Sequence, residues 1–153
     1  MATPTYDLLQ SVTLATDTAN VTVTGLPTDG SYRDLIIVLT GTMAVAGVGH
    51  GDIKFNFDTS NYHYLMMEYG TTLRSVRYNN ASQIRFSESN SFSATTLNNT
   101  IIEVFDYAAT DRHKPLLMKT GRTDGLIGQT AGRFASNSAI SRFVLGGDAA
   151  YKA

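Results

Sequence analysis

The chain contains no cysteine, so disulfide bonds and thiol-based redox catalysis are both excluded. Tryptophan is absent as well, and proline occurs only 3 times among 153 residues. Charged residues make up 16% of the chain, below the roughly 25% of an average soluble domain, and the formal net charge is −1. A surface with so little positive charge offers no electrostatic footprint for nucleic acid, and we therefore expect no nucleic-acid partner.

Long hydrophobic runs are also missing. No segment approaches the roughly 20 apolar residues needed to cross a bilayer. Residues 1–6 (MATPTY) lack the basic and apolar regions of a secretory signal. We expect a product made in the cytoplasm of the cell that synthesises it, with no membrane partner.

The residues that are abundant favour strands. Glutamate and lysine, which favour helices, are scarce, whereas threonine, tyrosine and phenylalanine are frequent. Alternating or aliphatic segments predict strands at residues 6–14, 21–24, 35–39, 52–58, 62–69, 73–78, 100–107, 113–120, 129–135 and 139–145, with a shorter piece at 84–86. This pattern predicts one all-β domain spanning residues 1–153, a single β-sandwich of roughly nine or ten strands with jelly-roll wiring favoured.

Three details of this prediction concern particular segments. The aliphatic run at residues 35–39 (LIIVL) is typical of a strand buried on both faces. In residues 52–58, the alternation places Ile53, Phe55 and Phe57 toward the core. Residues 87–99 are mostly serine, asparagine and threonine, which predicts a long polar surface loop, either a contact element or a disordered excursion.

The sequence carries no recognisable catalytic or metal-binding motif. His50, His63 and His113 lack metal-ligand spacing, and the glycine-rich residues 47–51 lack the lysine and following helix of a phosphate loop. Asp52 and Asp58 bracket a strand without a calcium-loop pattern, which favours turn capping. We therefore predict no catalytic residue, no cofactor-binding residue, no metal site and no enzymatic activity.

Two weaker possibilities stay open. Glu68 and Glu103 lie on predicted strands and would be the carboxylate pair of a glycosidase if the fold brought them together. Tyr62, Tyr64 and Tyr69 are candidate glycan-stacking or interface aromatics, since Tyr62 and Tyr64 share one strand face. The alternative for the tyrosines is one side of the sandwich core with hydroxyls reaching the rim.

Several segments together resemble virion structural proteins of tailed bacteriophages. They are YDLLQSVTL at residues 6–14, VTVTGLP at 21–27, YRDLIIVL at 32–39, IKFN at 53–56 with SNY at 60–62, and GRFA at 132–135. The resemblance covers most of the chain, and its motifs are structural. Similar proteins often continue past a glycine-rich turn into one more short strand, whereas this chain ends at residues 146–153 (GGDAAYKA).

The resemblance implies a small β-sandwich located on the virion, as a capsid decoration protein or a tail or fibre component. The leading expectation is a non-enzymatic capsid decoration (cement) protein. It would bind the major capsid protein on the outer surface and stabilise the shell through residues 2–6 and the loop at 87–99. It would associate with itself as a homo-oligomer, with a trimer expected. The alternative is a carbohydrate-binding or receptor-binding module of a tail or fibre.

Overall fold

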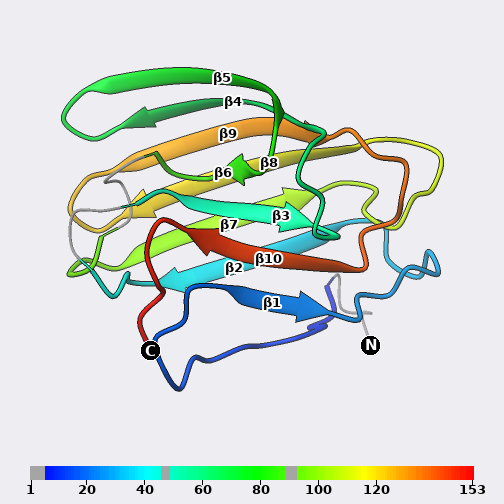
Figure 1. The fold of residues 1–153 in the computed structure, drawn as a ribbon, viewed down its shortest axis with the longest axis horizontal. Helices are drawn as coiled ribbons and strands as arrows, with labels where there is room; N and C mark the ends of the chain where they lie inside the picture. The colour runs from blue at the N-terminus through cyan, green and yellow to red at the C-terminus, as the bar shows by residue number, and fades with distance from the viewer. Residues whose placement is uncertain (1–5, 46–48, 89–92) are drawn as a thin grey trace.

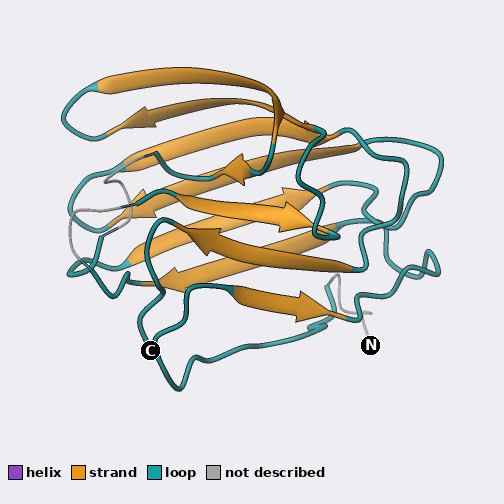
Figure 2. Cartoon of the chain, in the orientation of Figure 1, coloured by secondary structure: helices purple, strands orange, loops and turns teal. Residues whose placement is uncertain are grey.

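Two antiparallel sheets face each other in the computed structural model, which describes residues 6–45, 49–88 and 93–153 (Figure 1). Every regular element in the described part of the chain is a strand, as Figure 2 shows, so the predicted all-β sandwich is confirmed. The strands are β1 (Val21–Thr24), β2 (Leu35–Gly41), β3 (Gly51–Phe55), β4 (Tyr62–Tyr69), β5 (Leu73–Ala81), β6 (Ile84–Arg85), β7 (Asn98–Val104), β8 (Lys114–Arg122), β9 (Ile127–Phe134) and β10 (Arg142–Gly147).

The two sheets differ in size. The smaller has the order β1-β10-β3-β6, and the larger has the order β2-β7-β8-β9-β4-β5. The chain passes repeatedly between them, and the smaller sheet lies in front of the larger one in Figure 1. Jelly-roll wiring stays a prediction.

The core lies between the sheets and follows from the two-residue period of the strands. In β4, residues Tyr62, Tyr64 and Met66 point inward, and Leu65 and Met67 point outward. The rings of Phe55, Tyr62 and Phe134 pack together, with centroids 5.1 to 6.3 Å apart. This cluster joins β3 of the small sheet to β4 and β9 of the large one, which holds the two layers together.

Three local predictions were wrong. Residues 6–14 form no strand, although their alternation is strand-like. The run at 35–39 became β2, an edge strand whose inner residues are buried but whose outer residues Ile36 and Val38 are exposed. Phe57 lies outside the core because the chain leaves β3 in a turn, with φ of 53° at Asn56 and 59° at Phe57.

The predicted polar loop is shorter than expected. Residues 89–92 lie outside the described part of the chain, and Asn98 and Asn99 belong to β7. At its start, Ser87 is buried and its hydroxyl accepts a hydrogen bond from the backbone of Gly51 at 2.8 Å. At its end, the buried Asn98 side chain holds the turn at residues 93–96 by hydrogen bonds to three carbonyl groups, those of Gly41, Ser93 and Thr96.

The membrane prediction has one structural counterpart. No helix that could span a bilayer occurs within residues 6–45, 49–88 and 93–153.

Candidate functional site

The side of the large sheet that points away from the core is the main candidate, and we name it the outer face. Strand register arranges its side chains in transverse rows, one residue per strand. One row contains Ile36, Glu103, Leu117, Ala131, Leu65 and Arg77 in the order of the strands. The next row contains Val38, Ile101, Lys119, Gln129, Met67 and Ser75.

Large apolar side chains occupy much of the outer face and remain exposed. Val38 has 68% of its surface exposed and Ile127 has 63%. The full set is Ile36, Val38, Leu65, Met67, Tyr69, Leu73, Ile101, Leu117 and Ile127. Single exposed apolar residues are ordinary, but contiguous ones on a sheet usually mark a surface that another molecule covers.

The apolar residues form one continuous area. Ile36, Val38, Ile101 and Leu117 are neighbours on β2, β7 and β8. Tyr69, Leu73 and Ile127 meet at the opposite corner of the sheet. Ala131 lies between Leu117 and Leu65 in the first row, and Leu65, Met67 and Tyr69 follow one another on the exposed side of β4, which connects the two groups.

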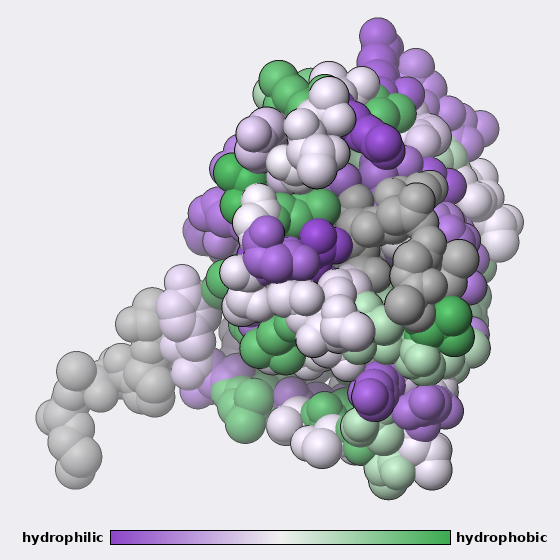
Figure 3. All heavy atoms as spheres, turned by 90° about the vertical axis from the view of Figure 1, so that its left-hand side faces the viewer, coloured by the Kyte–Doolittle hydropathy of each residue, from purple (hydrophilic) through white to green (hydrophobic). Residues whose placement is uncertain are grey.

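The outer face differs from the end of the sandwich that Figure 3 shows. There, hydrophobic side chains occur in small groups among polar ones. On the outer face, half of the twelve residues in the two rows given above are large exposed apolar side chains, and the three charged ones are Glu103, Lys119 and Arg77.

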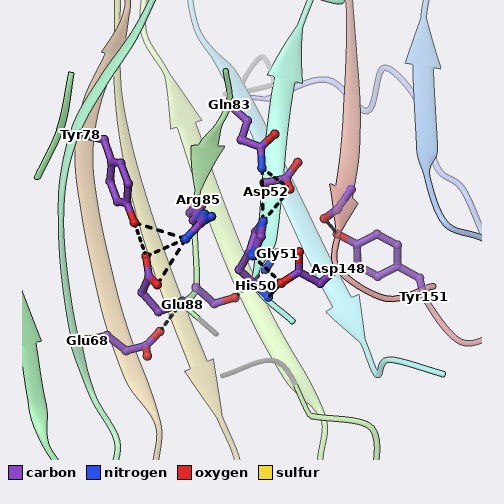
Figure 4. A network of polar contacts seen from close by, with 12 residues as sticks. His50, Gly51, Asp52, Glu68, Tyr78, Gln83, Arg85, Glu88, Asp148 and Tyr151 are labelled. Carbon is purple, nitrogen blue, oxygen red and sulfur yellow. Dashed lines mark hydrogen bonds and ion pairs between the residues drawn. The ribbon is translucent and has the colours of Figure 1, made fainter. Parts of the chain in front are cut away.

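A first polar network surrounds His50, just before β3 (Figure 4). Its Nδ1 lies 2.7 Å from Asp148 Oδ2, and its Nε2 lies 3.3 Å from Asp52 Oδ2. Gln83 Nε2 donates a hydrogen bond to Asp52 at 3.0 Å and lies 3.2 Å from His50 Nε2. Both ring nitrogens thus have close polar neighbours, and the side chain is buried.

A second network joins the small sheet to the edge of the large one (Figure 4). Arg85 on β6 contacts Glu88 at 3.3 Å and lies over the ring of Tyr78 on β5. Tyr78 donates a hydrogen bond to Glu88, and the Glu88 backbone N–H donates one to Glu68 at 3.1 Å. Burial raises the pKa of Tyr78. Both networks therefore fasten strands together.

The side chains of the three tyrosine candidates do not all point to the same side of the large sheet. Tyr62 and Tyr64 do share one strand face, but that face is the core, where 0% and 5% of their surfaces are exposed. Neither ring is accessible for stacking on a sugar, so the stacking hypothesis is wrong for these two residues. Tyr69 points outward and is 51% exposed, which places it on the apolar outer face.

The glutamate pair is not brought together. Glu68 points toward the core from β4, whereas Glu103 lies on the outer face of β7. Strands β8 and β9 lie between β7 and β4, so three strand spacings put the two glutamate-bearing strands about 14 Å apart. A retaining glycosidase needs its carboxylates about 5 Å apart and an inverting one at most about 9.5 Å, so this pair fits neither.

The remaining candidates have structural surroundings. His50 is buried, His63 is half-buried on β4 and His113 is exposed before β8. Asp58 caps its own turn by accepting a hydrogen bond from the backbone of Ser60 at 2.9 Å, as predicted. The same prediction was wrong for Asp52, which is buried within β3 and accepts a hydrogen bond from Gln83. No group of three or more histidine, aspartate and glutamate side chains within the described ranges could hold a metal ion.

Comparison with known proteins adds no relative. No protein-family model matches this chain, and neither the curated proteins nor the solved structures contain a match to it.

The sequence did not single out the outer face. Its signal was present in the alternation of residues 36, 38, 65, 67 and 69, but apolar residues on both sides of a strand are equally typical of strands buried on both faces.

Proposed function

We propose that this protein is a non-enzymatic assembly protein that binds another protein through the outer face of its large sheet. The main support for this function is the continuous area of exposed apolar side chains on that face. The resemblance at residues 6–39 favours a phage particle as the location and the major capsid protein as the partner, which makes capsid decoration the leading function.

The size of the outer face supports a protein partner. Six strands spaced about 4.8 Å apart cover about 29 Å, and three outward rows cover about 20 Å along the strands, or about 600 Å². A standard protein interface buries about 800 Å² on each partner. The outer face therefore supplies about three quarters of a standard contact, and residues at its rim must supply the rest.

The mechanism is bridging between capsid subunits. Burial of exposed side chains such as Val38, Leu117 and Met67 against neighbouring capsid subunits removes apolar surface from water. Rupture of the shell must then separate these contacts in addition to those between the subunits.

Co-sedimentation with capsids that lack this protein tests the proposal. The parent should bind saturably, and imaging should show it at fixed positions on the outer surface. Leu117→Asp, which places a charge at the centre of the outer face, should weaken binding at least about 10-fold, or about 1.4 kcal/mol.

Thr22→Asp is the matched control, because Thr22 is exposed on the small sheet on the opposite side of the molecule. It should bind like the parent. Equal binding by the Leu117 variant would show that the outer face is not the contact. Failure of the folded parent to bind capsids would contradict decoration and direct the search to tail components and host glycans.

A further inference from the structure

Residues 6–14, which we name the arm, extend along the open side of the sandwich where β1 and β2 are the edge strands (Figure 1). The arm and these strands enclose a groove of about 1200 Å³. Core residues including Val23, Leu26 and Ile37 line this groove. The sandwich therefore has an apolar opening that its own arm crosses.

The arm is weakly held by its own chain. Leu8 is 84% exposed and Tyr6 is 71% exposed. Within the described residues, the arm forms no backbone hydrogen bond with the rest of the chain. Its polar link is a hydrogen bond between the Tyr32 hydroxyl and the Asp7 carboxylate, which raises the pKa of Tyr32. A segment with strand-like alternation is thus left without a strand partner.

A possible partner for such a segment lies beside it. Strand β2 is paired with β7 on one side only, and its other edge faces the groove. Unpaired strand edges tend to pair with a further strand, commonly from another chain.

Chain direction disfavours pairing of the arm with its own β2. At one end of the arm, Asp7 lies next to Tyr32, which precedes β2. Beyond the other end, Thr18 pairs with Tyr151, and Tyr151 also pairs with Met43, which follows β2. The arm therefore runs parallel to β2. The strand pairs of the large sheet are all antiparallel. A parallel pair of the arm with β2 would be slightly less stable than an antiparallel one.

We propose that two copies of this chain exchange their arms, with each arm forming an antiparallel strand on the free edge of β2 in the other copy. A two-fold axis reverses the direction of the second copy's arm, so antiparallel pairing becomes available between chains. Each copy makes the same arm-to-β2 contact with the other, so the two copies form a closed dimer. This proposal does not depend on capsid binding, and it replaces the trimer expected from the sequence with a dimer.

The base of the arm is fixed in a position that permits the exchange. Thr18 and Tyr151 form two backbone hydrogen bonds, of 3.0 and 2.7 Å, and the Ala153 backbone N–H donates one to Asp17. Residues 6–14 can therefore move while this base stays in place. Nine extended residues span about 30 Å, several times the spacing of about 4.8 Å between neighbouring strands.

Sedimentation of purified protein, without capsids, tests the exchange. The parent should have twice the mass of one chain at micromolar concentration. Val12→Pro removes a backbone N–H and disrupts strand pairing of the arm, so the mass should fall by half. Val12→Thr, which keeps a β-branched side chain, should remain a dimer. The thermal midpoint of dilute, monomeric Val12→Pro should match that of dilute parent.

A cross-linking experiment identifies the contact itself. The chain has no cysteine, so one copy carrying Val12→Cys can be mixed with a differently tagged copy carrying Val38→Cys and treated with a short bismaleimide. The mixed pair should cross-link, whereas Val12→Cys with Ser75→Cys, located on the opposite edge strand β5, should not.

A monomeric parent, or a dimer that persists in Val12→Pro and gives no Val12–Val38 cross-link, would overturn the arm exchange. Neither result bears on capsid binding, which is measured separately with the Leu117 variant.

Discussion

Tyr62 shows how a single side chain joins two parts of the sandwich. Its ring lies in the core, while its hydroxyl accepts a hydrogen bond from the Phe55 backbone N–H at 2.8 Å and donates one to the Phe55 carbonyl at 3.2 Å. The hydroxyl thereby satisfies buried backbone groups at the end of β3, where the chain turns away from the sheet.

Tyr62→Phe should lower the free energy of unfolding by about 1–2 kcal/mol, because the Phe55 N–H loses its partner in a site that water does not reach. Tyr69→Phe on the exposed outer face is the matched control and should change stability by less than about 0.5 kcal/mol. Urea denaturation of the three proteins measures both effects. Equal stability of parent and Tyr62→Phe would show that the hydroxyl contributes nothing.

Asn98 and Asn99 are neighbours in sequence with different surroundings. The buried Asn98 amide donates to three carbonyl groups, and its oxygen accepts a hydrogen bond from the Ser93 backbone. Asn99 is exposed and accepts a hydrogen bond from Thr40. Asn98→Ala should lower the free energy of unfolding by about 3 kcal/mol and Asn99→Ala by about 0.5 kcal/mol. Comparable losses in guanidinium denaturation would contradict this assignment.

At the scale of elements, β9 contains two glycines with different amounts of room. A Cβ at Gly132 would lie 2.7 Å from the Tyr64 Cβ and 2.8 Å from the His63 carbonyl oxygen. A Cβ at Gly128 would lie 3.5 Å from the Met67 carbonyl oxygen, which is an ordinary contact. Gly132 thus allows β9 to pass close to the Tyr64 side chain on β4.

Gly132→Ala should therefore destabilise the protein by about 2–3 kcal/mol, since the β4–β9 pair must shift to accept the new methyl group. Gly128→Ala should change stability by no more than about 1 kcal/mol. Thermal unfolding of both variants measures the difference. A Gly132 variant as stable as the parent would mean that the strands can separate locally without loss.

The sequence predicted most strands but not which of their faces are covered. The alternation of residues 62–69 predicted β4 and that Tyr62 and Tyr64 share one face, but it did not determine whether that face lies in the core. The run at 35–39 has the same aliphatic composition whether its outer residues meet this chain or another, so its position at the edge of a sheet could not be predicted. The strand-like pattern of residues 6–14 likewise gives no information about its pairing partner.

The candidate site was less predictable, because it depends on contacts between distant segments. Glu68 and Glu103 both lie on strands, as expected, but strand order and the opposite directions of their side chains separate them. The outer face joins residues from strands far apart in the chain, and its rows require a register that single segments do not specify.

For the whole molecule, buried tyrosines predict the response to alkali. Burial raises the pKa of Tyr62, Tyr64 and Tyr151 well above the usual value of 10. Below pH 10 these groups are neutral in the folded and unfolded chain. Above pH 10 the unfolded chain loses their protons while the folded one retains them, so stability falls as pH rises, by at most about 1.4 kcal/mol per tyrosine and pH unit.

Titration followed by tyrosinate absorbance should therefore show that the buried tyrosines Tyr62, Tyr64 and Tyr151 ionise only as the circular dichroism of the sheets is lost. Ionisation of every tyrosine near pH 10, with the sheets intact, would contradict the burial of these rings.

The pairing of Thr18 with Tyr151 also determines how the molecule responds to mechanical force. The two residues form an antiparallel bridge, with the amino-terminal and carboxyl-terminal ends of the chain leaving it on the same side. Tension applied between the two ends therefore acts across this bridge before it reaches either sheet. The bridge should open bond by bond, as in unzipping, and the sandwich behind it should withstand a higher force.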